Sequence, residues 1–335
     1  MAKIRICLVA VELILLLNLL GLTNPTTSVV ASPDEVKWSR VNIPTEGDPG
    51  DWVLAPGSDV QHLTVAIDGT LYAYGKGLTY TLYKSIDGGY SWSYIGGVED
   101  DIVDIATEPH VASIVYYATS SDVYKSSDAG VSFTPLPPNP GGAGNNKIEI
   151  TSIDVVRLGS HNIIAVGTKD KDSSEYGGVY ILDESESFTW VDSNIGSYDV
   201  YAVAFSPNFA FDQQLVAVVT DEKDTFVTTK VGDAGWGETV GDATMVGITP
   251  TSAAIAFPDD YDATPKGSVL FVAIDTESDE GDVYRISSVP APGSSVATDL
   301  NIGSAYGLNN VDVTTLAITG NATAANILAG AAARA

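Results

Sequence analysis

Short apolar runs separated by turn residues repeat along the whole chain after residue 31. Each repeating unit opens with one such run, and clear examples are residues 63–67, 102–106, 201–205 and 252–257. A second run follows in residues 71–74, 114–118, 163–166, 215–219 and 269–273. Runs of this length, rich in β-branched and aromatic residues, are typical of strands, and a helical period of 3.6 residues is hard to find. The pattern therefore predicts an all-β protein.

One decapeptide occurs twice. Residues 83–92 read Tyr-Lys-Ser-Ile-Asp-Gly-Gly-Tyr-Ser-Trp, and residues 124–133 read Tyr-Lys-Ser-Ser-Asp-Ala-Gly-Val-Ser-Phe, 41 positions later. Both fit S-x-D-x-G-x-x-[WF], with shared positions Ser85, Asp87, Gly89 and Trp92 in the first copy and Ser126, Asp128, Gly130 and Phe133 in the second. Asp can accept bonds from backbone N–H groups, Gly supplies a positive φ, and the aromatic residue restarts a strand facing the core. The motif predicts a structural hairpin turn.

Weaker copies of the decapeptide extend the repeat. Residues 179–190 keep Asp183 and an aromatic residue, and residues 229–236 keep Asp233. Four strands per unit, at a period of roughly 40 to 55 residues, is the arrangement of a β-propeller. The sequence predicts five complete blades of four antiparallel strands and a partial sixth blade, whose strands fall in residues 311–318 and 326–330.

At these motifs the sequence resembles the Asp-box, or BNR, repeat superfamily, which includes sialidases, sortilin-like receptors, some endoglucanases and a photosystem II assembly factor. The resemblance covers residues 38–331, and residues 60–136 carry its most specific motifs. It implies that each box joins the third and fourth strands of a blade, on the rim away from the usual ligand face. Asp87 and Asp128 are then structural. Residues 38–41 resemble a fourth strand that would complete the last blade.

The first 31 residues have the pattern of a signal peptide. Lys3 and Arg5 precede a mostly apolar run over residues 6–22, and Val29-Val30-Ala31 offers a cleavage site. We expect residues 32–335 to form the propeller, incomplete at its C-terminus, in an extracellular or cell-surface location. The alternative is an uncleaved membrane anchor. Cys7 is the only cysteine, so the mature chain would contain no disulfide.

Charge restricts the class of partner. The chain has 43 Asp and Glu against 16 Lys and Arg, a net charge of −27. Nucleic acid is not expected as a partner, because phosphate backbones require clustered cations. No cofactor is expected, and calcium is the minor alternative. Residues 275–282 resemble a calcium loop except that Glu280 stands where an EF-hand has Gly, and His62, His110 and His161 occur singly.

Two enzymatic hypotheses can be compared with the residues available. A sialidase needs three arginines around the substrate carboxylate, and residues 32–335 contain only Arg40, Arg157, Arg285 and Arg334, so sialidase activity is disfavoured. Another glycosidase needs two carboxylates about 5 to 9.5 Å apart. Carboxylates near strand starts are abundant and give no unique pair: Asp101, Asp104, Asp154, Asp199 and Asp312.

The pattern favours a non-catalytic binding or interaction module whose partner is a protein or glycan at the cell surface. A rigid propeller can present variable loops without changing its scaffold. A polysaccharide hydrolase is the alternative, because strand tyrosines could stack on sugars or pack in the core: Tyr72, Tyr74, Tyr116 and Tyr117. An assembly factor for a membrane complex is a third hypothesis.

Overall fold

The computed structural model describes residues 59–76, 78–95, 98, 101–172, 175–186, 188–237, 243–247, 249–263, 268–288, 295–302 and 311–331. All of them belong to the unit Val36–Ala335. The predicted signal peptide and residues 38–41 lie outside the described residues. Within the described part of the chain, no helix has the length and apolarity needed to cross a membrane.

The described strands form five four-stranded sheets and one two-stranded sheet, which we call blades 1 to 6 in chain order. Blade 1 contains β1 (Asp59–Val65), β2 (Leu71–Lys76), β3 (Leu82–Ser85) and β4 (Ser93–Ile95), and blade 2 contains β5 (Asp104–Thr107), β6 (Val115–Ala118), β7 (Val123–Ser126) and β8 (Thr134–Pro135). Blade 3 contains β9 (Ile148–Leu158), β10 (His161–Asp170), β11 (Gly178–Asp183) and β12 (Val191–Asp192).

The remaining blades follow the same plan. Blade 4 contains β13 (Asp199–Phe205), β14 (Gln214–Thr220), β15 (Thr225–Val231) and β16 (Ala243–Val246). Blade 5 contains β17 (Ser252–Ala256), β18 (Val269–Asp275), β19 (Val283–Ser288) and β20 (Ser295–Asp299), and blade 6 contains β21 (Val313–Thr319) and β22 (Asn326–Ala331). Two single-turn helices lie between strands, η2 (Pro140–Gly142) and α2 (Phe209–Asp212).

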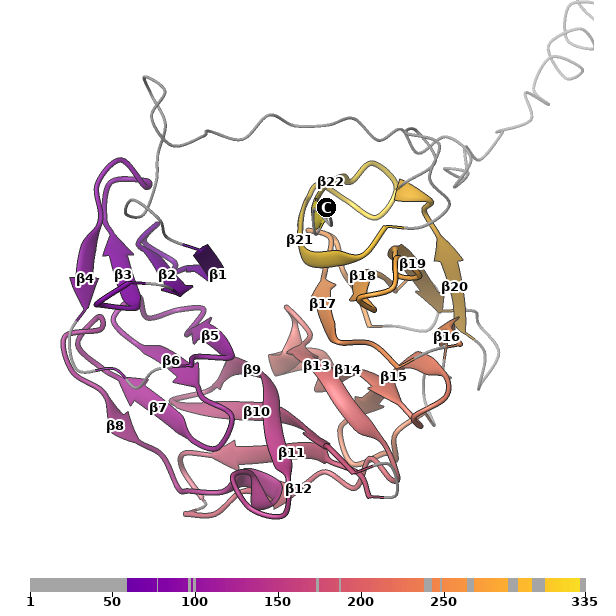
Figure 1. Cartoon of the computed structure of the whole chain (residues 1–335), viewed down its shortest axis with the longest axis horizontal. Coiled ribbons are helices and arrows are strands. Elements are labelled where there is room, and N and C mark those ends of the chain that lie inside the picture. The colour runs from indigo at the N-terminus through magenta and orange to yellow at the C-terminus, as the bar shows by residue number, and fades with distance from the viewer. Residues whose placement is uncertain are drawn as a thin grey trace, which may run out of the picture. The chain divides into compact units, whose positions relative to one another are not determined.

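Consecutive strands pair antiparallel within each blade, and the first strand of each blade contacts the first strand of the next. Figure 1 shows the blades following one another in chain order, from β1 to β22. The predicted β-propeller with five complete blades and a partial sixth is therefore confirmed. The predicted apolar runs fall on first and second strands. One long strand, β9, was missed, although Ile148, Ile150, Ile153 and Val155 mark it as apolar.

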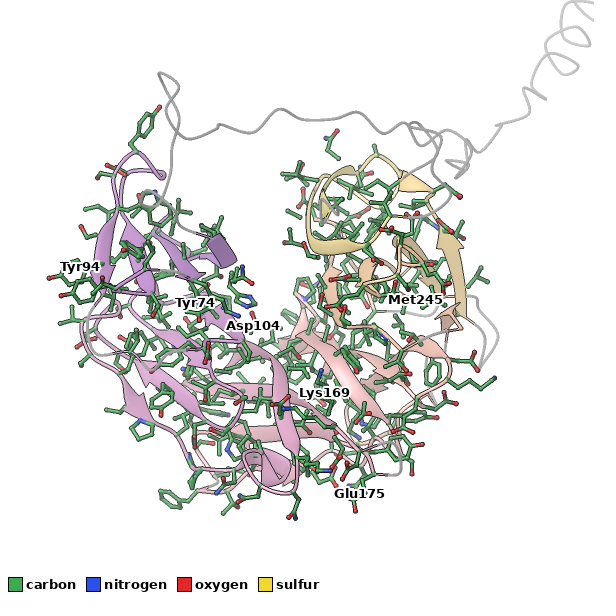
Figure 2. All side chains as sticks on the ribbon, viewed as in Figure 1. Tyr74, Tyr94, Asp104, Lys169, Glu175 and Met245 are labelled. Carbon is green, nitrogen blue, oxygen red and sulfur yellow. The ribbon has the colours of Figure 1, made fainter. Side chains whose placement is uncertain are left out.

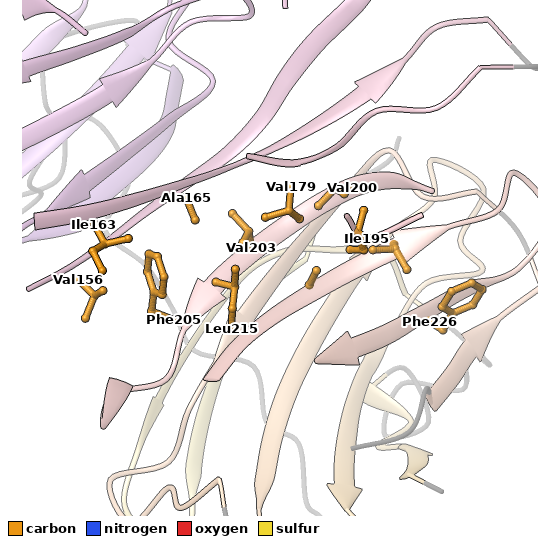
Figure 3. Close-up of a cluster of buried hydrophobic side chains, with 12 residues drawn as sticks. Val156, Ile163, Ala165, Val179, Ile195, Val200, Val203, Phe205, Leu215 and Phe226 are labelled. Atoms are coloured by element: carbon orange, nitrogen blue, oxygen red, sulfur yellow. The ribbon is translucent and has the colours of Figure 1, made fainter. Parts of the chain in front are cut away.

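Each interface between neighbouring blades contains its own apolar cluster. Figure 3 shows the cluster between blades 3 and 4, where Val156 and Ile163 of one blade meet Phe205 and Leu215 of the next. Equivalent clusters lie between blades 1 and 2, 2 and 3, 4 and 5, and 5 and 6. The core is thus divided among the blade interfaces.

The strand tyrosines belong to these interfaces. Tyr72, Tyr74, Tyr116 and Tyr117 are each at most 1% exposed. Tyr117 stacks on Tyr124 with ring centroids 4.8 Å apart. A buried ring offers no face to a sugar, so the hypothesis that these four residues stack on a glycan is wrong, and they pack in the core.

Candidate functional site

The first decapeptide forms a tight turn between β3 and β4. The Ser85 hydroxyl donates to Asp87 Oδ1 at 2.8 Å and accepts the Gly89 N–H at 2.9 Å. Asp87 also accepts the Ser91 N–H at 2.9 Å and the Ser91 hydroxyl at 2.6 Å. These bonds, the Ser91 hydroxyl first, lower the pKa of Asp87 to about 2. The carboxylate stays ionised and bonds within its own turn.

The second decapeptide repeats this geometry between β7 and β8. Ser126 donates to Asp128 at 2.8 Å and accepts the Gly130 N–H at 2.8 Å, and Ser132 donates its N–H and hydroxyl to Asp128 at 2.9 and 2.6 Å. These bonds lower the pKa of Asp128 to about 2, and the bond from the Ser132 hydroxyl is again the largest cause. The motif as read from the sequence omitted Ser91 and Ser132, although both decapeptides share a serine there.

The second turn also contacts the preceding blade. Gly130 has φ +84°, and a Cβ placed there would lie 2.9 Å from Ile95 Cδ1 of blade 1. Lys84 of blade 1 donates to the Ala129 carbonyl at 3.0 Å. Phe133 packs edge-on against Tyr117 with centroids 4.8 Å apart, and Trp92 of the first turn is half-buried. The second turn therefore stabilises the β7–β8 hairpin and packs against blade 1.

The weaker copies keep the contact between blades but change the turn. Asp183 accepts the Ser185 N–H at 2.7 Å, and Asp233 is exposed. Trp190 of blade 3 donates from Nε1 to the Pro137 carbonyl of the preceding segment at 2.7 Å. Trp236 of blade 4 donates in the same way to the Ser193 carbonyl at 3.2 Å.

Two of the candidate catalytic carboxylates lie on the first, inner strands of adjacent blades, and each forms a hydrogen bond to the next blade. Asp104 of β5 accepts the Ile153 N–H of β9 on Oδ2 at 3.0 Å, and Asp154 of β9 accepts the Phe205 N–H of β13 on Oδ2 at 2.7 Å. On Oδ1, each accepts the N–H of the next residue at 2.8 Å. Figure 2 labels Asp104 beside the inner strands. Asp104 and Asp154 therefore connect blades 2, 3 and 4.

Burial shifts the titration of this pair. Desolvation raises the pKa of Asp104 to about 6 and that of Asp154 to about 7, against the lowering effect of their backbone hydrogen bonds. The Asp104 charge adds to the rise at Asp154. His62 Nδ1 lies 4.0 Å from Asp104 Oδ1. Desolvation, and to a smaller extent the charge of Lys76, lowers the pKa of His62 to about 4. Neutral histidine forms no ion pair with Asp104 at pH 7.

Asp199 and Asp312 hold the loop of the preceding blade. Asp199 Oδ1 accepts the Asp170 and Gly177 N–H groups at 2.8 and 2.9 Å. Asp312 accepts the N–H groups of Thr276, Gly281 and Asp279 at 2.8, 3.1 and 2.8 Å, which bends the acidic segment at residues 275–282 around its carboxylate. The fifth candidate, Asp101, is exposed.

Neither a metal cluster nor a sialidase arginine triad is present among the described residues. No group of three or more His, Cys, Asp or Glu side chains is placed there to hold a metal ion. Arg157 lies on blade 3, 3.7 Å from Glu108 of blade 2, and Arg285 lies on β19 of blade 5. Arg40 and Arg334 lie outside the described residues.

A cavity of about 310 Å³ opens between blades 3 and 4. Its lining combines carboxylates, a lysine and apolar side chains: Ile181, Asp183, Glu186, Val191, Asp192, Ser193, Asn194 and Lys230. Lys230 donates to the Ala234 carbonyl. With three carboxylates against one ammonium, the cavity has an excess of negative charge.

These features define a β-propeller whose recognisable carboxylates bind backbone amides within or between blades. Among solved structures, the chain is similar to YCF48 bound to D1 peptide, with 13% identity over 82% of this chain and 75% of that one at a TM-score of 0.48. It is similar to the Niastella koreensis GH74 enzyme, with 15% identity over 76% of this chain and a TM-score of 0.48. It is also similar to the Penicillium chrysogenum alpha-L-arabinanase complexed with arabinobiose, with 13% identity over 79% of this chain and 99% of that one at a TM-score of 0.41.

The chain spans 39% of the length of that GH74 enzyme. No protein-family model and no curated protein matches the sequence. At these identities the structural similarities concern the fold alone.

The Gly130 contact gives a first prediction. Gly130→Ala is expected to destabilise the protein by about 2 kcal/mol, because the new Cβ meets Ile95 at a positive φ. Gly88→Ala is the control: Gly88 has φ +74° with nothing within 4 Å of its Cβ, and Ala129 occupies the equivalent position of the second turn at φ 57°. Chemical denaturation checks this, and equal losses in the two variants would contradict a contact between blades.

The raised pKa values give a second prediction. Because Asp154 has a folded pKa of about 7 and an ordinary value of 3.8, the folded state binds its proton more tightly, and the free energy of unfolding should fall as pH rises from 4 through 7. Asp154→Asn should flatten this slope, whereas exposed Asp221→Asn should not. Melting temperatures of the wild type and the two variants from pH 4 to 8 measure these slopes. A slope that is unchanged in Asp154→Asn would refute the raised pKa of Asp154.

Proposed function

We propose that this protein is an exported Asp-box propeller that acts as a non-catalytic binding module for a protein or glycan at the cell surface. The observation that carries the proposal is that three of the candidate catalytic carboxylates are already hydrogen-bonded within the protein. Asp104, Asp154 and Asp312 each accept protein hydrogen bonds on both oxygens. A general acid or nucleophile needs an oxygen directed at its substrate. These residues instead stabilise the scaffold.

The two full boxes support the Asp-box assignment within this proposal. The box residues bond to one another in the same way in two successive blades. Their serine and aspartate side chains organise the turn, so we assign Asp87 and Asp128 a structural role. The basic start and apolar run of residues 1–31 support export through a signal peptide.

The cavity between blades 3 and 4 suggests the chemistry of a protein partner. Asp183, Glu186 and Asp192 provide negative charge, and Ile181 and Val191 provide apolar surface for an aliphatic stem. A lysine or arginine side chain combines a cationic head with such a stem. The net charge of −27 would also attract a basic partner over distance at low ionic strength. We therefore assign basic peptide segments as the preferred ligand class.

Binding of lysine- and arginine-containing peptides tests this proposal. Peptides of this kind should bind the secreted protein with an affinity that falls as NaCl rises, and matched peptides with glutamine in place of the cations should not bind. Asp192→Asn should weaken binding by about tenfold, on the order of one charge-assisted hydrogen bond. Asp221→Asn, an exposed carboxylate outside the cavity lining, is the control. Equal binding of both peptide sets would contradict the proposal.

A polysaccharide hydrolase is the second candidate, favoured by one observation. Asp104 and Asp154 lie on adjacent inner strands with pKa values raised to about 6 and about 7, in the range of a general acid. Release of reducing ends from a polysaccharide panel would reveal such an activity. Loss of that activity in folded Asp154→Asn would assign catalysis to this pair, and inactivity of the wild-type protein across the panel would reject the candidate.

A further inference from the structure

The charges that line the cavity between blades 3 and 4 are divided between the two blades. The carboxylates of Asp183, Glu186 and Asp192 come from β11, β12 and the turn between them in blade 3. The ammonium of Lys230 comes from β15 of blade 4. The cavity therefore presents anionic groups from one blade and a cationic group from the next.

Lys230 occupies a repeat position whose lysine joins two blades elsewhere in the propeller. Lys84, Lys125 and Lys230 are each the second residue of a copy of the decapeptide. Lys84 donates to a backbone carbonyl of blade 2 at 3.0 Å, and Lys125 donates to Glu184 of blade 3 at 2.6 Å, so both bind the following blade. Lys230 instead donates to the carbonyl of Ala234 in its own turn. The lysine of blade 4 is therefore used differently from its equivalents in blades 1 and 2.

The ammonium of Lys230 also forms no ion pair within the described part of the chain, although three carboxylates line the same cavity. Other described lysines do form ion pairs with Asp or Glu: Lys125, Lys147, Lys171 and Lys223. Lys230 is half-buried. An ammonium has three donors, and the Ala234 carbonyl accepts from one of them. The remaining donors of Lys230 are available to an anionic group of a ligand.

The size of the cavity and its two kinds of charge restrict the ligand. A volume of about 310 Å³ is at the small end of the range for ligand pockets, so we expect it to enclose one residue. Asp183 Oδ2 already lies 3.3 Å from His161 Nε2, whereas Glu186 and Asp192 are exposed and can accept a cation. A C-terminal lysine or arginine combines a cationic head, an apolar stem and a carboxylate in one residue. An internal lysine or arginine has no carboxylate to offer Lys230.

We propose that this cavity binds the C-terminal lysine or arginine of a peptide, with the terminal carboxylate on Lys230. Glu186 and Asp192 bind the cationic head, and Ile181 and Val191 contact the stem. The inference rests on the proposed binding of basic peptides and specifies which part of the peptide is recognised. Lys230 is then the residue that distinguishes a free C-terminus from an amide or an internal position.

Calorimetric titration of the full chain with three peptides tests this inference. The first peptide ends in lysine with a free carboxylate, the second is the same peptide with a C-terminal amide, and the third is a free acid that ends in glutamine. The first should bind about tenfold tighter than the second, on the order of one charge-assisted hydrogen bond. Lys230→Met should remove this difference by weakening the free acid and not the amide. Lys223→Met is the matched control and should keep the difference, because Lys223 is 81% exposed and outside the cavity lining.

The outcomes separate this inference from the proposed function. Equal binding of the two lysine peptides, both tighter than the glutamine peptide, would overturn the role of Lys230 and leave the binding of basic peptides standing. A preference for the free acid that persists in Lys230→Met would also overturn that role. Glutamine and lysine peptides of equal affinity, or no binding of any peptide, would overturn both proposals. Lys230→Arg keeps the charge and should retain the preference, and circular dichroism checks that both variants at this position are folded.

Discussion

Every complete blade of this propeller is a sheet with two apolar faces, and burial of both faces against neighbouring sheets is the constraint on which the fold depends. Five apolar clusters meet this requirement between consecutive blades. The fully buried second strands, such as β14 and β18, follow directly, because they lie in the middle of a sheet covered on both sides. Among the described residues this requirement is least satisfied in blade 6, where β21 and β22 are almost entirely half-buried or exposed.

Apolar burial is not directional, so polar contacts set how each blade fits the next. The inner strands use Asp104 and Asp154 for this purpose, and the loops use Asp199 and Asp312. Lys125 of blade 2 donates to both oxygens of Glu184 in blade 3 at 2.6 Å, with both side chains about four-fifths buried. Some of the acidic residues therefore have a structural role. Their carboxylates accept hydrogen bonds from backbone N–H groups that folding removes from water and that would otherwise have no acceptor.

The sequence was sufficient for the repeat and for most inner and second strands, because their apolar runs and the paired decapeptides are local patterns. It was insufficient for β16 and β20 and for the structural roles of Asp104 and Asp154. Asp154 bonds to Phe205, 51 positions away, and nothing in the residues around Asp154 specifies that partner. Asp104 and Asp154 were among the candidate carboxylates, but their hydrogen bonds depend on how two blades pack. Ser91 and Ser132 could have been identified from the shared serine in the decapeptides.

Native-state hydrogen exchange at the Ile153 and Phe205 amides tests the central claim most directly. These amides donate to carboxylates of the preceding blade, so their protection reports the contacts between blades rather than the pairing within a sheet. If the blades form one cooperative unit, both amides should exchange only through global unfolding, with the free energy measured by denaturation. Exchange of these amides at the rate of exposed loop amides would contradict the account.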